Sequence, residues 1–395
     1  MGWLKQVVAV TLVNLRTIPQ RLGSSFVAIV GIAGVVVVLV AVLSIAEGFN
    51  AAMQGAGSPD RALVMRSGAD TEMTSGLGGP ETDIIKQAPG ILRDGQTLAA
   101  SAELFVIIDL PKISTGTPAN VPLRGIEPAA LGVRDEVSIV EGRMLQFGTN
   151  EVVVGRSAKG QFAGLGTGSS IKSGQTTWTV VGVFESDGSV AETEIWCDAR
   201  TLQGAYRRGN SFQSVLARLD SPESYTAFKD WLTANPQLNV SVRREAEYYA
   251  AQSATLTNLI RTVGFAIAAL MAIGAVFGAI LTMYTAVATR AREIATLRAL
   301  GFDSAAVLIS VLAESLALAA LGGAIGGLVA LLGFNGYQTS TMNFQTFSQV
   351  AFAFRVTPAL LVMGLVWALV MGLVGGLLPA LRASRLPISK ALREL

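Results

Sequence analysis

Histidine is absent from this 395-residue chain, and cysteine occurs once, as Cys197. The lack of histidine excludes Ser-His-Asp triads, histidine general bases and histidine metal ligands. A single thiol excludes an intrachain disulfide and a cysteine-rich zinc site. Charge is also scarce, because only 15% of the residues are Asp, Glu, Lys or Arg. With 51% hydrophobic residues and a mean hydropathy of +0.50, the composition indicates a membrane protein with a substantial soluble part.

Candidate chemistry is equally scarce. No stretch ends in the Gly-Lys-Ser/Thr of a phosphate-binding P-loop, and we interpret the run GLGTGSS (164–170) as a turn. The acidic pieces ESDG (185–188) and AETE (191–194) resemble metal-binding or glycosidase carboxylates, but a solvated strand–loop edge is the favoured interpretation. Cys197 is expected to be a small buried hydrophobe, since no histidine could activate it. The sequence therefore predicts no catalytic residue and no metal site.

Four stretches are long enough to cross a bilayer, which requires about 20 apolar residues. They are residues 23–46, 258–288 (which includes a stalk), 304–332 and 356–381. The first begins too far into the chain, and is too long, for a cleaved signal peptide, so we interpret it as a retained anchor. The third contains Glu314, the only acidic residue within a span. An acid inside the membrane is a candidate functional group, and an interhelical hydrogen bond or salt bridge is its favoured role.

Basic residues predict the orientation of these spans. They gather in the N-terminal segment, between the second and third spans and in the tail, whereas 333–355 holds one Arg and no Lys. By the positive-inside rule both termini and residues 289–303 are cytoplasmic, and 47–257 lies outside. Residues 47–261 carry 19 basic and 24 acidic residues, a net charge of −5, and the remainder has 11 and 4, a net charge of +7. Topology thus accounts for the basic residues, and nothing indicates nucleic acid.

The outer segment has the pattern of an α+β domain. Strands are predicted at 61–66, 151–155, 176–184 and 214–220, and helices near 82–87, 222–234 and 245–257. The last helix is expected to continue into the second span. The Gly-rich piece 67–80 is expected to be a mobile loop, and the aromatics of RREAEYY (243–249) are expected near the membrane surface. The predicted fold class is an α-helical membrane protein with four transmembrane helices and a large extracytoplasmic α+β domain inserted between helices 1 and 2.

Gly-x-x-x-Gly spacing recurs in the last three spans. The pairs are Gly274/Gly278, Gly322/Gly326, Gly323/Gly327 and Gly372/Gly376. This spacing lets apolar helices approach closely. Packing within the bundle and a homodimer seam both remain open as interpretations. Four helices alone make a thin bundle, which favours a partner subunit.

The segment TRAREIATLRALGF (289–302) is charged and helix-forming, although it only connects two spans. Its residues Ile294, Leu297, Leu300 and Gly301 recur at i, i+3, i+6 and i+7, which predicts one helical face. Arg290 and Glu293 are spaced to pair, but other internal pairs are few, which leaves charges for a partner. Gly301 can end the helix, and Asp303 or Ser304 can cap the next one. Either this helix receives a push from a soluble partner, or it is a tight interfacial turn.

The run REIATLRALGFDSAAVLISVLAESLALAALGGAIGG (292–327) resembles the signature of MacB/FtsX-type ABC transporter permeases. The tail GGLLPALRASRLPISKALREL (375–395) is similar to the family's ending. The runs EGRML, EVVVGRSAKGQF and WTVVGVFES resemble the MacB-like periplasmic core domain. The resemblance covers nearly the whole chain, and the family's order of one span, a large outer domain and three more spans is the order derived above.

The resemblance implies a dimeric or paired permease that binds ATPase subunits on the cytoplasmic side. A coupling helix would sit in an ATPase groove, with contact residues Arg290, Arg292, Glu293, Ile294, Leu297, Arg298, Leu300 and Gly301. No cofactor is expected on the chain itself, because ATP and Mg would be used by the partner ATPase. A periplasmic adaptor, an outer-membrane channel and membrane lipid are further expected partners.

The resemblance also completes the expected domain order. It comprises a cytoplasmic amphipathic elbow helix (1–22), transmembrane helix 1 (23–46), the extracytoplasmic core domain (47–257), helix 2 with its stalk (258–288), the coupling helix (289–303), helix 3 (304–332), an outer loop (333–355), helix 4 (356–381) and a cytoplasmic tail (382–395).

The function that this implies is mechanotransmission, in which ATP-driven movement of the outer domain, without a wide channel through the membrane, drives efflux or extraction of a substrate. The protein would lie in the inner membrane. Within the family, lipoprotein release and regulation of a cell-wall hydrolase are alternatives. Outside it, the alternative is a membrane-anchored extracytoplasmic enzyme or receptor. The missing histidine and the lack of a catalytic constellation argue against an enzyme.

Overall fold

The computed structural model describes residues 6–12, 22–95, 97–385 and 387, which form two units. The helical unit comprises Met1–Glu47, Asn258–Tyr337 and Phe354–Leu395 by its described residues, and the sheet unit comprises Gly48–Thr257 and Gln338–Ala353. Two long helices, α2 (Leu22–Gln54) and α8 (Glu245–Thr289), each contribute residues to both units.

Four helices of the described chain are long and apolar enough to cross a membrane: α2, α8, α10 (Ser304–Phe334) and α11 (Pro358–Ser384). The four predicted spans are thus confirmed. As expected, α8 joins the stalk to the second span in one helix of 45 residues, about 67 Å long. Asp303 caps α10 by accepting the Ala305 N–H. Of the predicted elbow helix (1–22), residues 6–12 are helical and Leu22 already belongs to α2. The other residues of that segment, like most of the tail, lie outside the described residues.

Small residues bring the helices of the helical unit together. A Cβ on Gly326 would lie 2.6 Å from the carbonyl oxygen of Ala33, and a Cβ on Gly322 would lie 2.9 Å from that of Ile29. The backbones of α10 and α2 therefore touch at these glycines, and neither position has room for a side chain. For this pair, packing within the bundle is the correct interpretation.

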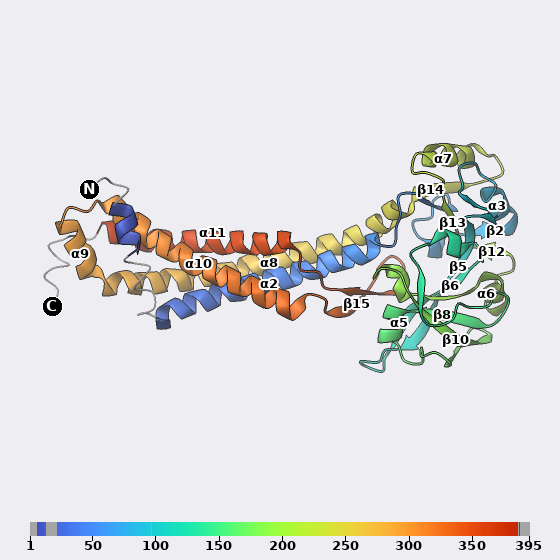
Figure 1. The fold of residues 1–395 in the computed structure, drawn as a ribbon, viewed down its shortest axis with the longest axis horizontal. Helices are drawn as coiled ribbons and strands as arrows, with labels where there is room; N and C mark the ends of the chain where they lie inside the picture. The colour runs from blue at the N-terminus through green and yellow to red at the C-terminus, as the bar shows by residue number, and fades with distance from the viewer. Residues whose placement is uncertain (1–5, 13–21, 96, 386, 388–395) are drawn as a thin grey trace. The chain divides into compact units, whose positions relative to one another are not determined.

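The glycine pair Gly372/Gly376 of α11 packs against α10, and these two helices lie side by side (Figure 1). A Cβ on Gly372 would lie 2.4 Å from that of Ala319, and a Cβ on Gly376 would lie 2.6 Å from that of Ser315. The Ser315 hydroxyl donates to the Gly372 carbonyl over 2.6 Å. This pair also packs within the bundle, and an interhelical hydrogen bond supports the contact.

The sheet unit is built on a mixed sheet in the order β14-β1-β13-β5-β6-β11-β8-β10-β7, with β9 paired to β10. The strands are β1 (Arg61–Arg66), β5 (Ala100–Pro111), β6 (Pro118–Ile126), β7 (Ser138–Gly142), β8 (Glu151–Gly155), β9 (Ser170–Ser173), β10 (Thr176–Glu185), β11 (Ile195–Asp198), β13 (Ser214–Arg218) and β14 (Val240–Arg244). All four predicted strands are present. The pairs β8/β10 and β6/β11 are parallel, and the other pairs are antiparallel.

Two hydrophobic cores lie against this sheet. One packs β14, β1 and β13 with α3 (Gly79–Ile85) and α7 (Ser224–Ala234), and the other packs β6, β8, β10 and β11 with α5 (Arg156–Gln161) and α6 (Ala199–Ala205). Trp178 and Trp196 are fully buried. The remaining short elements are η2 (Glu72–Thr74), β2 (Leu77–Gly78), β3 (Arg93–Asp94), β4 (Thr97–Leu98), α4 (Ala130–Val133), η3 (Val190–Thr193) and β12 (Ser211–Phe212).

Three parts of the sheet unit differ from expectation. The predicted mobile loop at 67–80 contains η2, β2 and the start of α3, because Glu72 is buried beside Arg124. Tyr248 packs against Leu63 and Met65 in the sheet unit rather than at a membrane surface. Within the expected outer loop 333–355, strands β15 (Gln338–Met342) and β16 (Gln349–Ala353) form a hairpin that belongs to the sheet unit.

Candidate functional site

A short helix, α9 (Ala291–Ala299), connects α8 to α10. Its sequence favours a helix, since Glu293 lies in the first turn and Arg298 in the last, where their charges complement the helix dipole. Leu300 is the C-cap, and Gly301 follows with φ of +92°, a left-handed conformation that glycine adopts without strain. Asp303 then starts α10. Both ends of α9 are thus fixed by local sequence.

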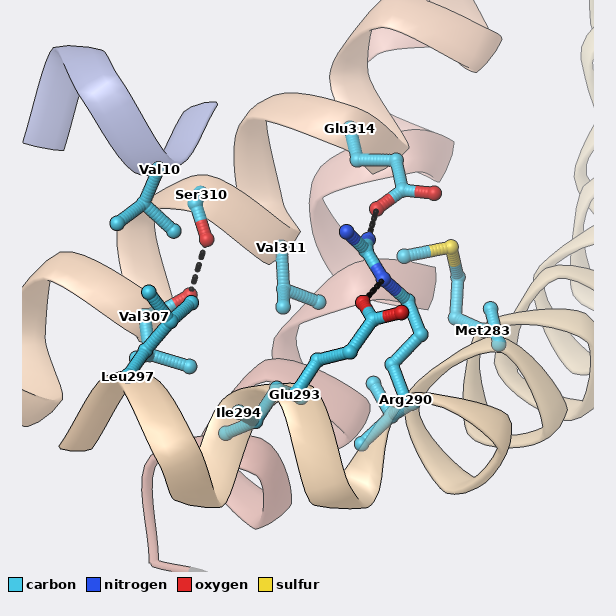
Figure 2. Close-up of a pocket in the computed structure, with 12 residues that line it drawn as sticks. Val10, Met283, Arg290, Glu293, Ile294, Leu297, Val307, Ser310, Val311 and Glu314 are labelled. Atoms are coloured by element: carbon cyan, nitrogen blue, oxygen red, sulfur yellow. Dashed lines mark hydrogen bonds and ion pairs between the residues drawn. The ribbon is translucent and has the colours of Figure 1, made fainter. Parts of the chain in front are cut away.

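The inner face of α9 packs on its own bundle. Ile294 and Ala295 are buried, and Ile294 belongs to a hydrophobic cluster with Met283 of α8, Val307 of α10 and Ala380 of α11. A cavity of about 20 Å³ is lined by Leu297 and also by Val10, which belongs to the helix at 6–12 (Figure 2). That volume has room for about one water molecule, so the helices around it are closely packed and the cavity is too small to be a ligand pocket.

An ion pair fastens the start of α9 to α10. Arg290 lies between two carboxylates, with its Nε 2.9 Å from an oxygen of Glu293 and its Nη1 3.5 Å from an oxygen of Glu314 (Figure 2). Arg290 and Glu314 are only 6% and 4% exposed. The predicted Arg290–Glu293 pair and the interhelical role of Glu314 are confirmed. The expectation that the charges of this segment remain available to a partner is wrong for Arg290.

The outer face of α9 is made by Arg292, Glu293, Thr296 and Ala299, which are all exposed, and the exposed C-cap residue Leu300 follows them. Leu300 is 73% exposed, although it is a large apolar side chain. The predicted face of Ile294, Leu297, Leu300 and Gly301 is therefore split. The helix ends at Ala299, so Leu300 and Gly301 no longer follow the helical spacing. The neighbouring helices cover Ile294 and part of Leu297.

The glycine pair of α8, Gly274 and Gly278, differs from the pairs of α10 and α11. A Cβ on Gly274 or Gly278 would meet nothing within 4 Å, and the neighbouring Ile273 and Phe277 are exposed. Among the described residues, no helix of this chain covers this face of α8. Packing within the bundle does not explain this pair.

A buried charge cluster, which the sequence did not predict, lies in the sheet unit. Arg124 of β6 pairs with Glu72, Glu103 and Glu194 over 2.7–2.8 Å, and Arg134 pairs with Glu103 over 2.6 Å. Burial raises the pKa of Glu103, but the two arginines outweigh it and hold that pKa below its ordinary value of 4.5. The carboxylates likewise hold the pKa of Arg124 well above its ordinary value, although burial acts to lower it. Each of the three carboxylates is thus paired with an arginine inside the cluster.

These contacts correct one interpretation of the acidic pieces. Glu192 and Glu194 are buried rather than solvated, since Glu192 accepts the Ser186 and Gly188 N–H groups and Glu194 pairs with Arg124. No metal-ligating cluster occurs among the residues that the structure describes. Residues 164–170 form turns, and Cys197 is fully buried, which raises the pKa of its thiol. Sequence reasoning missed the cluster because its members come from five separate segments.

Comparison with known proteins agrees with this architecture. Residues 25–235 match the MacB-like periplasmic core domain, and residues 265–388 match the FtsX-like permease C-terminal domain. No curated protein matches the chain.

Two solved structures are similar to about half of the chain. The periplasmic region of MacB from Actinobacillus actinomycetemcomitans is 13% identical, with a TM-score of 0.37, over 49% of this chain and 92% of that one. The extracellular domain of the noncanonic ABC-type transporter YknZ from Gram-positive bacteria is 14% identical, with a TM-score of 0.35, over 46% of this chain and 99% of that one.

Four candidate spans, a large mixed domain between the first and second, and a small packed helix between the second and third define a multi-pass membrane subunit of the permease class. The core-domain match covers more than half of the chain, and the permease match covers most of the rest. The chain therefore belongs to the MacB/FtsX-type family of ABC transporter permeases. Members of this family are the permease components of ABC transporters, and the ATPase lies in a partner subunit.

Proposed function

We propose that this permease couples ATP hydrolysis by a separate ATPase subunit to movement of its periplasmic domain, which drives efflux or extraction of a substrate. In this proposal α9 is cytoplasmic and docks on the ATPase, which uses ATP and Mg. The supporting observation is the two-sided construction of α9. Its inner face is fixed to α8, α10 and α11, and its outer face carries the exposed Leu300.

This construction suits the transmission of force. The Arg290–Glu314 pair and the buried Ile294 hold α9 to the helices, so that a push on the outer face would move α8 and α10 together. α8 continues without a break from the helical unit into the first turns that pack in the sheet unit. A movement of the C-terminal part of α8, which belongs to the helical unit, would therefore be transmitted along the same helix to the periplasmic domain.

Leu300 provides the direct test. Burying a leucine of this exposure in an ATPase groove would contribute about 1.5–3 kcal/mol, which corresponds to roughly a 10- to 100-fold change in affinity. We expect Leu300→Asp to lower the amount of P-loop ATPase that co-purifies with the tagged, full-length protein in mild detergent at least tenfold. Leu300→Met is the matched control, because it keeps the apolar contact, and it should retain the ATPase.

The outcomes separate the parts of the proposal. If the ATPase co-purifies equally with Leu300→Asp, α9 does not dock through this face. If no ATPase co-purifies with the unaltered protein, the coupling function is wrong. The other co-purifying chains, identified by mass spectrometry, distinguish the branches. An elongated adaptor indicates efflux through an outer-membrane channel, a second permease indicates lipoprotein release, and a hydrolase indicates control of the cell wall.

We further propose that Gly274 and Gly278 of α8 form the seam with a second permease copy. A close helix approach is the physical use of such spacing, and no described residue of this chain lies within 4 Å of a Cβ built at these two positions. Cysteines at Gly274 should crosslink two copies in membranes, whereas cysteines at Leu328, an exposed position of α10, should not. Absence of the Gly274 crosslink would place lipid on this face.

A further inference from the structure

The helix α8 begins with a buried carboxylate. Glu245, its first residue, is only 2% exposed and belongs to the sheet unit, not to the part of α8 in the helical unit. The first turn is closely packed, since a Cβ on Gly57 would lie 2.4 Å from the Cα of Ala246. Among the described residues, the Oε2 atom of Glu245 accepts no hydrogen bond. An ionised carboxylate in such a place is normally held by hydrogen bonds, so Glu245 is unusual.

The nearest cation to Glu245 is held by another carboxylate. Arg61 of β1 donates from Nη1 and Nη2 to the two oxygens of Glu136, over 2.8 and 2.7 Å. Its Nη1 is also 3.4 Å from Glu245 Oε2, but this contact is not a hydrogen bond. A guanidinium in a bidentate pair is oriented toward that carboxylate. Glu245 therefore shares the charge of Arg61 without a hydrogen bond from it.

The other charges around Glu245 are also paired. Arg134, in the segment after α4, pairs with Glu103 of β5 over 2.6 Å. Carboxylates outnumber arginines in this part of the sheet unit. The arginines are Arg61, Arg124 and Arg134, and the carboxylates are Glu72, Glu103, Glu136, Glu194 and Glu245. The other four carboxylates each accept a hydrogen bond from an arginine, which makes Glu245 the surplus charge.

The neighbours of Glu245 on its own stretch of chain do not compensate this charge. Arg244 donates to the carbonyls of Pro59 and Pro222, over 2.6 and 2.9 Å. Glu247 is exposed, and it adds a negative charge to the same turn. The dipole of α8 favours an ionised carboxylate at its first residue, but such an effect is only about two- to fivefold.

Burial decides the protonation of Glu245. Loss of hydration raises the pKa of Glu245 from its ordinary value of 4.5 to about 7. Arg61 and Arg134 act to lower this pKa, but they offset burial only in part. Glu103 and Glu136 act in the same direction as burial, because each repels a further negative charge. The side chain is thus poised to gain or lose a proton near neutral pH.

We propose that Glu245 is a proton-binding site that makes the attachment of α8 to the sheet unit sensitive to periplasmic pH. With a proton bound, the first turn of α8 packs against β1 without a surplus charge. Loss of the proton places a negative charge beside Glu103 and Glu136, and the repulsion weakens this packing. The site does not depend on the ATPase proposal, since every residue that forms it belongs to the sheet unit.

The pH dependence of stability tests the site. The folded pKa of Glu245 is above its ordinary value, so the folded state loses stability as the pH rises from about 4.5 to about 7. Glu245→Gln keeps the shape and cannot ionise. At pH 8 we expect it to favour the folded state at least tenfold over the unaltered full-length protein, which is about 3–5 °C in melting temperature. At pH 4.5 the two proteins should melt alike.

Glu247→Gln is the matched control, because it removes an exposed carboxylate from the same turn of α8. It should leave the difference between pH 4.5 and pH 8 unchanged. Infrared spectroscopy of the folded protein detects the proton directly. A carboxylic acid C=O band should disappear between pH 6 and pH 8.5, and this change should be absent from Glu245→Gln. Glu136→Gln frees Arg61 for Glu245, so it should move the disappearance of the band to lower pH.

Four results would overturn the proposal. One is a lower melting temperature of Glu245→Gln at pH 8, which would mean that an ionised Glu245 stabilises the fold through Arg61. The second is an equal pH dependence of the two proteins. The third is an equal effect of Glu247→Gln. The fourth is the lack of an infrared band that titrates in this range, and this measurement on the unaltered protein decides if Glu245→Gln fails to fold.

Discussion

Replacing Arg290 separates two roles for this residue, because the sequence suggests contact with the ATPase and the structure shows an ion pair with Glu314. The variant Arg290→Met keeps the length of the side chain and removes its charge. It leaves the Glu314 carboxylate buried without this cation. At a separation of 3.5 Å and an effective dielectric constant of about 20, the pair interacts with about 5 kcal/mol. Measured losses on breaking buried pairs are similar, about 3–5 kcal/mol.

Most of that loss is the unfavourable burial of the remaining charge. Neutralising Glu314 as well should therefore restore stability. We expect the double variant Arg290→Met/Glu314→Gln to lie within about 2 kcal/mol of the unaltered protein, although each single change is destabilising. The measurement is the free energy of unfolding of all four proteins in mixed detergent micelles, together with ATPase co-purification. Arg292→Met, an exposed change on the same helix, should affect stability far less.

One outcome of this double-mutant cycle would contradict a structural role for Arg290. If Arg290→Met leaves the free energy of unfolding unchanged, abolishes ATPase association and is not rescued by Glu314→Gln, then Arg290 acts on the partner. The ion pair would then have no structural role. If the double variant regains both its stability and its association with the ATPase, then Arg290 acts by holding α9 against α10 through Glu314, as the geometry of Figure 2 indicates.

Three further predictions concern single sites. Gly326→Ala places a Cβ against a carbonyl of α2 and should destabilise the helical unit by about 1–3 kcal/mol, whereas Gly274→Ala should not change the melting temperature of the subunit. Because the folded pKa of Glu103 lies below its ordinary 4.5, its stabilising contribution is complete above that pH and is lost as the pH falls through the lowered value. Fluorescence melts should show a fall in stability below about pH 4.5, smaller for Glu103→Gln, and equal curves for the two proteins would contradict this. Cys197, buried and with a raised pKa, should resist iodoacetamide at pH 8 until urea unfolds the protein; rapid labelling of the folded protein would show an exposed thiol.

The sequence alone determined the features that depend on neighbouring residues. Length and hydropathy were sufficient to predict the four spans, and short β-rich runs placed β1 and β8 at their observed bounds. Asp303 was among the expected caps, and the spacing of Arg290 and Glu293 predicted their pair. Each of these follows from the period of a helix or strand, or from one turn of backbone, which a single segment contains.

Only the tertiary structure decided which groups from distant segments meet. It placed Glu314 beside Arg290, gathered the carboxylates around Arg124, and joined the β15–β16 hairpin to the sheet unit. It also decided which face of α9 is covered, since that depends on the neighbouring helices and not on the nine residues of α9. Burial and charge pairing are properties of three-dimensional contact, and their partners are separated along the chain by elements whose packing no local pattern specifies.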